Sequence, residues 1–351
     1  NGGKVDAAAC MKTVRTAVVG VGHFGRLHAE KLAADGRAEL VAVVDTDAGR
    51  AAEIARRHGV RSLGDYRALA GAVDAVTIAA PTAAHHEIAR FFLDCGVHVL
   101  VEKPFTSTVT EADDLIRRAR AGALVLQVGH LERFFCTRTG LLQSVTRPLY
   151  IEALRISPFG PRGRDVGDVL DLMIHDIDLI ASLVDAPIKS VDAVGAPVLS
   201  QQEDIANARL LFQNGCVATV TASRIAFKSE RRIRVFQPDC LLSIDLLKRR
   251  VGVIRKAGKA DGPRFDVEES EFGAQDPLRD EISGFLEAVA TGGRPLVTGE
   301  DGRAALVIAL RVTESLREHL ALLEHHMHDT PNGDAGHAGS DDGDLARDLP
   351  A

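Results

Sequence analysis

Several features that mark other classes of protein are missing from this chain of 351 residues. No uninterrupted apolar stretch approaches the ~20 residues that a membrane-spanning helix needs. There is no basic excess, because the net charge is -7 and the pI is near 6.0, which argues against a nucleic-acid partner. The five cysteines are odd in number and form no Cys-x-x-Cys pair. We therefore expect reduced thiols in a cytoplasmic protein that does not act at a membrane.

The first part of the chain, between Val14 and Gly129, alternates short apolar runs with longer amphipathic ones. Continuous apolar strands between helices predict a parallel, doubly wound sheet that is covered on both faces. The predicted strands are 16–20, 40–45, 75–79, 97–101 and 124–128, and the predicted helices are 24–35, 48–58, 85–95 and 110–120.

The pattern changes after about Arg147, where short strand candidates follow one another with short connections. Asn214-Gly215 is a hairpin signal between two of them, and the pattern predicts a mostly antiparallel sheet. We expect one face of this sheet to pack on helices and the other, open face to serve oligomer formation or simply to meet solvent. The predicted strands are 149–157, 188–198, 206–212, 216–225, 231–237 and 240–246, and the predicted helices after them are 281–290 and 301–323.

A glycine-rich turn follows the first predicted strand. Gly20-Val21-Gly22-His23-Phe24-Gly25 fits the G-x-G-x-x-G pattern between a strand and a helix. Gly20 permits the tight turn, Gly22 lets the backbone approach a pyrophosphate, and Gly25 lets the helix pack on the strand. The turn therefore predicts a dinucleotide site that includes His23 and Phe24.

Asp45 ends the second predicted strand, where a carboxylate is expected to bind the adenosine ribose hydroxyls. A carboxylate there would repel a 2′-phosphate, so the cofactor is predicted to be NAD rather than NADP. The alternative is a plain strand-end aspartate or a helix cap, because Asp45-Thr46-Asp47 precedes a helix.

Two further motifs suggest chemistry. Glu102-Lys103-Pro104 ends the fourth predicted strand. Later, residues 169–184 read as a helix that is apolar nearly all round, and such a helix is expected to be buried. Polar residues at three- and four-residue spacing form one stripe along it: Asp168, Asp171, His175, Asp178 and Ser182. Buried carboxylates and a histidine are costly unless they are paired or used, so the stripe is either functional or a structural network.

These residue types suit oxidation of a secondary alcohol. His175 is predicted to be the general base, since histidine titrates near neutral pH. Asp171 and Lys103 are predicted to hold the substrate oxygens, and Lys103 to stabilise the developing alkoxide. Lys103 as the base itself is the alternative.

Together these motifs resemble the glucose–fructose oxidoreductase / inositol dehydrogenase (Gfo/Idh/MocA) family over about residues 14–323. The resemblance rests on the glycine turn, Pro81-Thr82 with His85, Glu102-Lys103-Pro104, the Gly129 to Arg133 stretch and Asp171-x-x-x-His175. It implies an N-terminal Rossmann domain followed by a mostly antiparallel, open-faced sheet that forms homodimers or homotetramers. It also implies a cis peptide bond before Pro104 and cofactor contacts from Pro81, Thr82, His85, Glu102 and Lys103.

Three stretches, 128–134, 171–179 and 204–209, look most like those of the sugar-nucleotide 3-dehydrogenases within that family. The likeness implies oxidation of UDP-N-acetylglucosamine to its 3-keto derivative for a partner aminotransferase in lipid A synthesis. It also implies that Arg133 contacts substrate. Arg162 and Arg164 lie on a Gly/Pro loop and could bind a diphosphate, or be ordinary surface residues. The alternatives are a dehydrogenase of a free polyol or sugar and a non-catalytic dinucleotide-binding regulator.

The predicted domain boundaries follow from these readings. Residues 1–12 are a disordered extension, 13–146 the NAD-binding domain, and 147–323 the substrate and oligomerisation domain, whose last helix packs back on the first. Residues 324–351 are predicted to be a disordered tail. His325, His326 and His328 are interpreted as part of this solvated tail, and no metal site is predicted.

Overall fold

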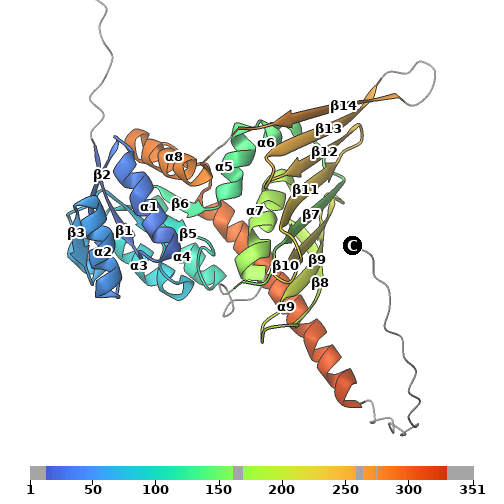
Figure 1. Cartoon of the computed structure of the whole chain (residues 1–351), viewed down its shortest axis with the longest axis horizontal. Coiled ribbons are helices and arrows are strands. Elements are labelled where there is room, and N and C mark those ends of the chain that lie inside the picture. Colours follow the sequence, from blue (N-terminus) through green and yellow to red (C-terminus); the bar gives the residue numbers. More distant parts are fainter. Residues whose placement is uncertain (1–12, 161–168, 258–263, 274–275, 330–351) are drawn as a thin grey trace, which may run out of the picture.

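The structure, a computed structural model, describes residues 13–160, 169–257, 264–273 and 276–329. Two sheets form its frame, and helices lie between and around them (Figure 1). No helix in these residues is long and apolar enough to cross a membrane.

The first sheet has six parallel strands in the order β3-β2-β1-β4-β5-β6. Its strands are β1 (Val14–Val19), β2 (Ala38–Val44), β3 (Arg61–Leu63), β4 (Ala75–Ile78), β5 (His98–Glu102) and β6 (Leu126–Gly129). Its helices are α1 (His23–Ala34), α2 (Ala48–His58), the 3-10 turn η1 (Tyr66–Leu69), α3 (Thr82–Asp94) and α4 (Val109–Ala121). The predicted doubly wound sheet is thus confirmed, with β3 as the strand that the sequence analysis missed. Three partly exposed residues that pair only with β2 give no periodic signal.

The turn after β1 has the geometry that its glycines predicted. Gly20 has φ +84°, and a Cβ there would lie 2.6 Å from the nitrogen of Ala80. A Cβ at Gly25 would lie 1.7 Å from the Gly20 oxygen. Since neither position has room for a side chain, α1 can pack closely against β1.

The strand order reverses between β1 and β4, because β2 and β3 lie on one side of this pair and β5 and β6 on the other. Ligands of such sheets bind beyond the carboxyl ends of the strands at this reversal. The end of β5 lies beside that of β4, so Lys103 comes to the same edge as the glycine turn.

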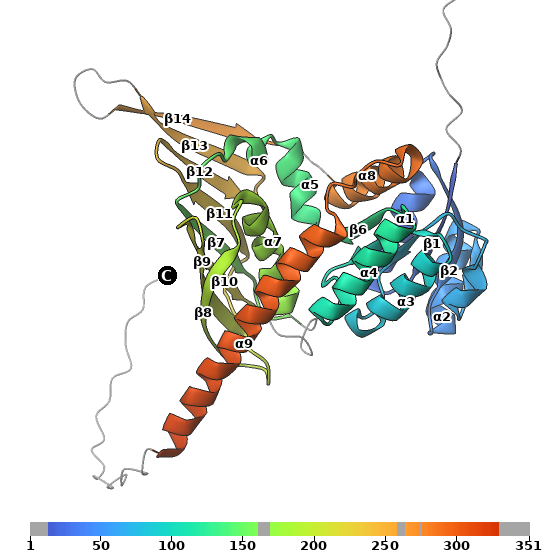
Figure 2. The ribbon, with the colours of Figure 1, turned by 180° about the vertical axis from the view of Figure 1, so that it is seen from behind.

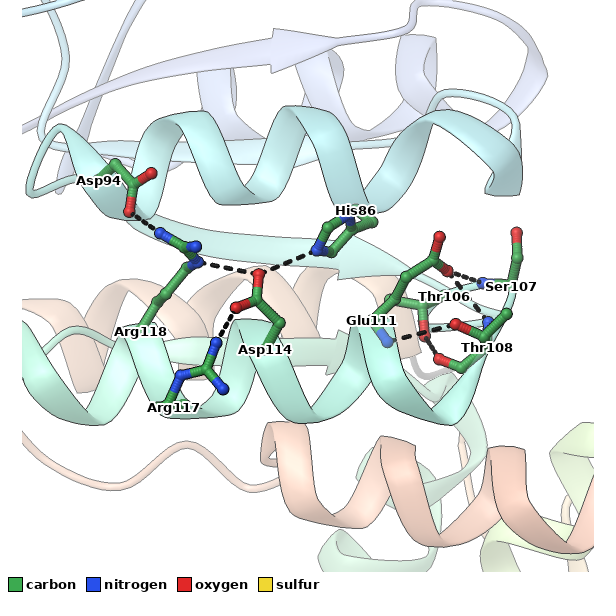
Figure 3. A network of polar contacts seen from close by, with 9 residues as sticks. All are labelled: His86, Asp94, Thr106, Ser107, Thr108, Glu111, Asp114, Arg117 and Arg118. Atoms are coloured by element: carbon green, nitrogen blue, oxygen red, sulfur yellow. Dashed lines mark hydrogen bonds and ion pairs between the residues drawn. The ribbon is translucent and has the colours of Figure 1, made fainter.

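The segment after β5 is anchored by α4. The peptide bond between Lys103 and Pro104 is cis, as the family resemblance implied. Thr108 caps α4 by accepting from the Glu111 nitrogen at 3.2 Å, and the Glu111 carboxylate accepts from the Thr108 nitrogen at 3.0 Å (Figure 3). Asp114 on the same helix accepts from His86 of α3 at 3.0 Å. This network fixes the return of the chain just after Lys103.

The second sheet has eight strands in the order β14-β13-β12-β11-β7-β10-β9-β8. Only β7 and β10 pair in parallel, so the sheet is mostly antiparallel as predicted. Its strands are β7 (Tyr150–Ile156), β8 (Ile188–Ala196), β9 (Ile205–Phe212), β10 (Val217–Ser223), β11 (Glu230–Phe236), β12 (Cys240–Asp245), β13 (Arg250–Ala257) and β14 (Arg264–Glu271). The sequence analysis missed β13 and β14, because most of their described side chains are at least partly exposed and the apolar alternation is lost.

Helices pack on only one face of this sheet within the described residues (Figure 1). They are α5 (Leu131–Arg138), α6 (Leu141–Ser144), the π-helical turn η2 (Val169–Met173), α7 (Ile174–Leu183) and α9 (Gly299–Asp329). The remaining helix, α8 (Pro277–Thr291), packs against α1 and α5 instead. The alternation in β10 fits this arrangement, because Ala218, Val220 and Ala222 are fully buried whereas Thr219 and Thr221 are only partly buried. The long helix predicted over 169–184 therefore begins with a π turn, and α7 proper starts at Ile174.

The last two helices return to the first sheet. Leu278 and Phe285 of α8 lie in one core with Leu32 of α1. The segment before α9 forms an antiparallel bridge from Thr298 to Gln127 of β6, and α9 then runs diagonally across the second sheet (Figure 2). Helix α9 continues to Asp329, so its predicted end at residue 323 and the start of the predicted tail fall inside a helix.

Candidate active site

A cavity of about 570 Å³ lies at the strand-order reversal of the first sheet. Gly20 and Gly22 line one side of it and Pro81 another, with Asp45 between the ends of β1 and β2. The nearest atom to a Cβ built on Gly22 is 3.7 Å away, so the turn has an open face toward the cavity. A concave space beside backbone N–H groups at a helix start is suited to a pyrophosphate.

Asp45 is nearly buried, and its carboxylate faces the glycine turn. One oxygen accepts from the Val21 nitrogen and the other from the Asp47 nitrogen, each at 2.9 Å. Arg50 lies 3.7 Å from the carboxylate and lines the same cavity. Asp47, rather than Asp45, caps α2 by accepting from the Arg50 nitrogen. The alternative reading of Asp45 as the helix cap is therefore wrong.

The other predicted cofactor residues lie around this cavity in different ways. His23 and Phe24 are exposed at the start of α1, and Thr82 begins α3. His85 is buried, with one ring nitrogen 2.8 Å from the Ala80 oxygen and the other 3.0 Å from the Pro104 oxygen. Burial lowers the pKa of His85, whereas its contacts with the two carbonyl oxygens act to raise it. This arrangement favours a role for His85 in fixing the two loops over a direct cofactor contact.

Lys103 and Asp171 meet between the two sheets. The Lys103 Nζ donates to the Asp171 backbone oxygen at 2.7 Å and to its carboxylate at 3.1 Å. The lysine side chain is 11% exposed and the aspartate 39%, so the pair sits at the rim of the interior. The neighbouring Glu102 points inward, where its carboxylate binds His28 at 2.8 Å.

His175 lies one helical turn after Asp171, as the predicted stripe required. Its Nδ1 is 2.8 Å from Oε2 of Glu132, which is an ion-pair distance. The contact does not meet the angular criteria of a hydrogen bond. Burial lowers the pKa of His175; the charge of Glu132 raises it, and the charge of Lys103 lowers it further. The imidazole is therefore neutral at pH 7 and able to accept a proton.

Glu132 is the functional candidate that the sequence analysis did not single out. Its other carboxylate oxygen accepts from Arg155 at 2.9 Å, and Arg155 binds Asp176 through two nitrogens at 2.7 and 2.9 Å. Burial would raise the pKa of Glu132, but His175, in its protonated form at acid pH, and Arg155 hold that pKa well below its usual range. Glu132 is thus an anion fixed against the imidazole. It lies inside the Gly129–Arg133 stretch that carried the resemblance, and that stretch was the available signal.

Arg133 and Ser182, which the sequence analysis named as candidates, have structural contacts instead of facing the Lys103–His175 site. The Arg133 side chain is 9% exposed and lies 3.1 Å from the Asp301 carboxylate and 3.5 Å from that of Asp178. Its guanidinium is thus shared between two carboxylates, which favours a structural role over the predicted substrate contact. Ser182 donates to the Leu179 backbone oxygen. Arg162, Arg164 and Asp168 lie outside the described residues.

The chain's residues fit NAD. One cavity runs past Gly22 and the start of α1 to the Asp45 carboxylate. The glycine turn and the helix start would hold the pyrophosphate of NAD, and Asp45 would bind its adenosine ribose. The edge of the sheet then leads to Lys103, Asp171 and His175, which supply a donor, an acceptor and a base.

Comparison with known proteins agrees with this geometry. A model of the oxidoreductase family with an NAD-binding Rossmann fold matches residues 14–130, and a model of the GFO/IDH/MocA C-terminal domain matches residues 157–237. A UDP-N-acetylglucosamine 3-dehydrogenase from Acidithiobacillus ferrooxidans is 40% identical over 302 residues, which cover 85% of this chain and 96% of the relative. A solved structure of the enzyme of that name from the same organism superposes with a TM-score of 0.83, at 39% identity, and covers 88% of this chain and 99% of the other.

More distant relatives share the architecture. A scyllo-inositol 2-dehydrogenase (NAD(+)) from Bacillus subtilis is 27% identical, covering 87% of this chain and 94% of the relative. A levoglucosan dehydrogenase solved with NADH and levoglucosan has a TM-score of 0.77 at 20% identity, covering 88% of this chain and 98% of the other, which shows a common fold. By the identity of 40% and the match of both family models, this chain belongs to the Gfo/Idh/MocA family and is an oxidoreductase with an NAD-binding Rossmann domain.

Proposed function

We propose that this protein oxidises a secondary alcohol of a sugar nucleotide with NAD, and that the substrate is UDP-N-acetylglucosamine, oxidised at its 3-hydroxyl. The observation that carries the proposal is the meeting of Lys103, Asp171 and the His175–Glu132 pair at the edge of the NAD-binding sheet. The relative that is 40% identical is named for this reaction, which supports the choice of substrate.

His175 acts as the general base. Because Nδ1 faces Glu132, Nε2 is the atom that takes the hydroxyl proton. Glu132 then stabilises the imidazolium that forms, and Arg155 keeps Glu132 in place. When bound, NAD supplies the acceptor for the hydride that leaves the same carbon.

Lys103 stabilises the reacting oxygen. Its ammonium is held by Asp171 and can turn one N–H toward the alcohol oxygen, where negative charge develops. Both described contacts of the Lys103 Nζ are with oxygens that accept from it, which suits a hydrogen-bond donor. This geometry favours His175 as the base.

The experiment that tests the function is the formation of NADH from NAD and UDP-N-acetylglucosamine. A matching aminotransferase and glutamate are included, because they remove the keto product and pull an unfavourable equilibrium. We expect turnover with the nucleotide sugar that disappears with free N-acetylglucosamine. Turnover with free N-acetylglucosamine or an inositol at equal efficiency would reject the sugar-nucleotide proposal in favour of a polyol or sugar dehydrogenase. Binding of NAD without turnover of any of these substrates would favour a regulator.

We also propose the setting in which this reaction takes place. The 3-keto sugar nucleotide is consumed by a partner aminotransferase in lipid A synthesis, and the reaction is cytoplasmic, where NAD is available. The protein acts as a homodimer or homotetramer that joins through the face of the second sheet left open by the helices. That face carries Leu154, Thr219 and Thr221 beside a hollow that the Glu152–Arg234 ion pair also lines, so it offers both small side chains and charges to a second copy.

A further inference from the structure

Three titratable side chains gather next to the Lys103 backbone. His28 comes from α1, Glu102 from the end of β5 and Glu281 from α8. All three are buried, and one ligand atom from each lies within 4.8 Å of the others. Two elements of the first sheet and a helix from the end of the chain therefore meet at one polar point.

Within this cluster His28 and Glu102 have partners. His28 Nε2 lies 2.8 Å from one Glu102 oxygen, and the other oxygen accepts from the Lys103 backbone nitrogen at 3.3 Å. A Cβ on Gly129 would lie 3.1 Å from this carboxylate, so the carboxylate packs directly against the β6 backbone. Glu102 is thus fixed on three sides, and it in turn fixes the residue that carries the catalytic ammonium.

Glu281 is different. It is 0% exposed, and neither carboxylate oxygen has a hydrogen-bond partner among the described residues. Its backbone is held in place, since Gln127 of β6 donates to the Glu281 carbonyl at 3.1 Å. An ionised carboxylate in this position, beside that of Glu102, would lack both water and a donor, so the cluster requires a proton or a cation.

A proton on Glu281 meets this requirement, because a ligand atom of Glu102 lies within 4.8 Å of one in the Glu281 carboxylate and can accept that proton in a hydrogen bond. His28 Nε2 and the Lys103 N–H are both directed at Glu102, whereas no donor among the described residues reaches the Glu281 carboxylate. Burial, followed by the charges of Glu102 and Glu132, raises the pKa of Glu281 well above its usual range. Burial acts to raise the pKa of Glu102, but the contact with His28 and the charge of Lys103 outweigh burial and hold that pKa low.

We propose that Glu281 is a neutral carboxylic acid that donates a hydrogen bond to Glu102, and that it is a positioning residue for Glu102 and Lys103. The positioning of Lys103 rests on the proposed function, whereas the protonation of Glu281 does not. Ionisation of Glu281 at alkaline pH would place two negative charges in a dry interior and loosen the end of β5. Lys103 would then lose its position and the protein would lose stability over the same pH range.

The direct test is infrared difference spectroscopy of the whole protein at pH 8, comparing the wild type with Glu281→Gln. We expect the carbonyl band of one protonated carboxylic acid in the wild type and its loss in the variant. Glu287→Gln, at an exposed site on the same helix, is the matched control and should keep the band. Absence of the band from the wild type, or a stoichiometric metal ion found there by elemental analysis, would overturn the proposal. Both of these measurements use wild-type protein and do not depend on how the variant folds.

Thermal unfolding gives a second, independent readout. A raised folded-state pKa adds stability that is complete below the unfolded value of 4.5 and is lost as pH rises toward the folded value. The melting temperature of the wild type minus that of Glu281→Gln should therefore fall by about 2 °C per pH unit in that window. An equal pH dependence in the two proteins would contradict the proposal, even if the enzyme proved to use another substrate. The pH profile of kcat tests the positioning of Lys103. A loss of kcat at alkaline pH in the wild type but not in Glu281→Gln would support the positioning role of Glu281. The same alkaline loss in both proteins would show that the protonation of Glu281 does not act on Lys103.

Discussion

At the residue scale, His175 is the proposed general base, and opposing influences set its protonation. Burial and Lys103 lower its pKa, whereas the Glu132 carboxylate at 2.8 Å raises it. The balance lies on the low side, so we expect the acid limb of kcat/KM below the ordinary histidine value of about 6.5. The base is thus ready at neutral pH, and the carboxylate that will stabilise its charged form is already in place.

Replacing Glu132 by Gln should change the pH profile in a specific direction. Loss of the negative charge lowers the pKa of His175 further, so the acid limb of kcat/KM should move to lower pH. At the same time kcat should fall by about tenfold or more, because the imidazolium loses its partner. Steady-state kinetics between pH 5 and 8, roughly the range over which histidine titrates, measures both effects.

Glu314→Gln on the exposed surface of α9 is the control for this variant, because it removes the same charge far from the site. Its profile should match that of the wild type. An acid limb that moves to higher pH in Glu132→Gln, or does not move, would show that Glu132 does not act on His175.

Asp45 should determine the choice between NAD and NADP. Asp45→Asn keeps one oxygen to accept from the Val21 nitrogen but removes the charge that repels a 2′-phosphate, and Arg50 lies close enough to meet that phosphate. We expect the ratio of kcat/KM for NADP to that for NAD to rise by about tenfold or more. An unchanged ratio, measured with both cofactors at saturating substrate, would contradict the assignment.

Single residues were predictable where local chemistry defines them. Gly20, Lys103 and His175 lie in short motifs, and the structure brings Lys103 together with Asp171 as expected. Glu132 and Glu281 were not predictable in this way, because each is a lone glutamate whose importance arises from burial and from partners distant in sequence. Arg133 is the opposite case, because its motif suggested a substrate contact but its side chain binds two carboxylates of the protein itself.

At the element scale, the packing of α1 on β1 depends on a missing side chain. Gly25→Ala would put a Cβ 1.7 Å from the Gly20 oxygen, so the helix must move away from the turn. We expect a loss of about 3 kcal/mol in the free energy of unfolding, measured by urea denaturation, together with weaker NADH binding.

Gly36→Ala is the matched control for that loss, because nothing lies within 4 Å of its Cβ and its φ is not positive. It should leave the stability unchanged or raise it by about 0.5 kcal/mol. If Gly25→Ala and Gly36→Ala changed the free energy of unfolding equally, the close approach of α1 to the Gly20 turn would not require a glycine at position 25.

Most elements could be placed from periodicity alone, since α2 and the strands of the first sheet bury an apolar face. The exceptions lack that contrast. Strand β14 is exposed along its described length, and η2 has the composition of the helix it precedes, so only packing reveals its wider turn.

At the scale of the whole molecule, the open face of the second sheet should control assembly. Leu154→Glu places a charge among Thr219, Thr221 and Arg232 on that face. If two copies join there, the substitution should yield monomers by light scattering while the circular dichroism spectrum stays the same. Glu314→Lys on α9 serves as the control and should remain assembled. A wild type that is monomeric, or a variant that assembles normally, would contradict the proposed interface.

The whole architecture was the most predictable level, because an alternating βα pattern followed by hairpin signals restricts the fold to a parallel sheet and an antiparallel one. The way α8 and α9 return to the first sheet was less visible. It depends on contacts such as the bridge from Thr298 to Gln127, which join distant parts of the chain.

The central claim is that His175 is the base of a hydride-transfer site whose cofactor binds independently of it. The most direct measurement compares the wild type with His175→Ala, following NADH formation from UDP-N-acetylglucosamine and, separately, NADH binding by fluorescence titration. We predict that kcat falls by about 10² to 10⁴-fold while the Kd for NADH stays within about twofold. A variant that binds NADH normally and turns over at the wild-type rate would contradict the account.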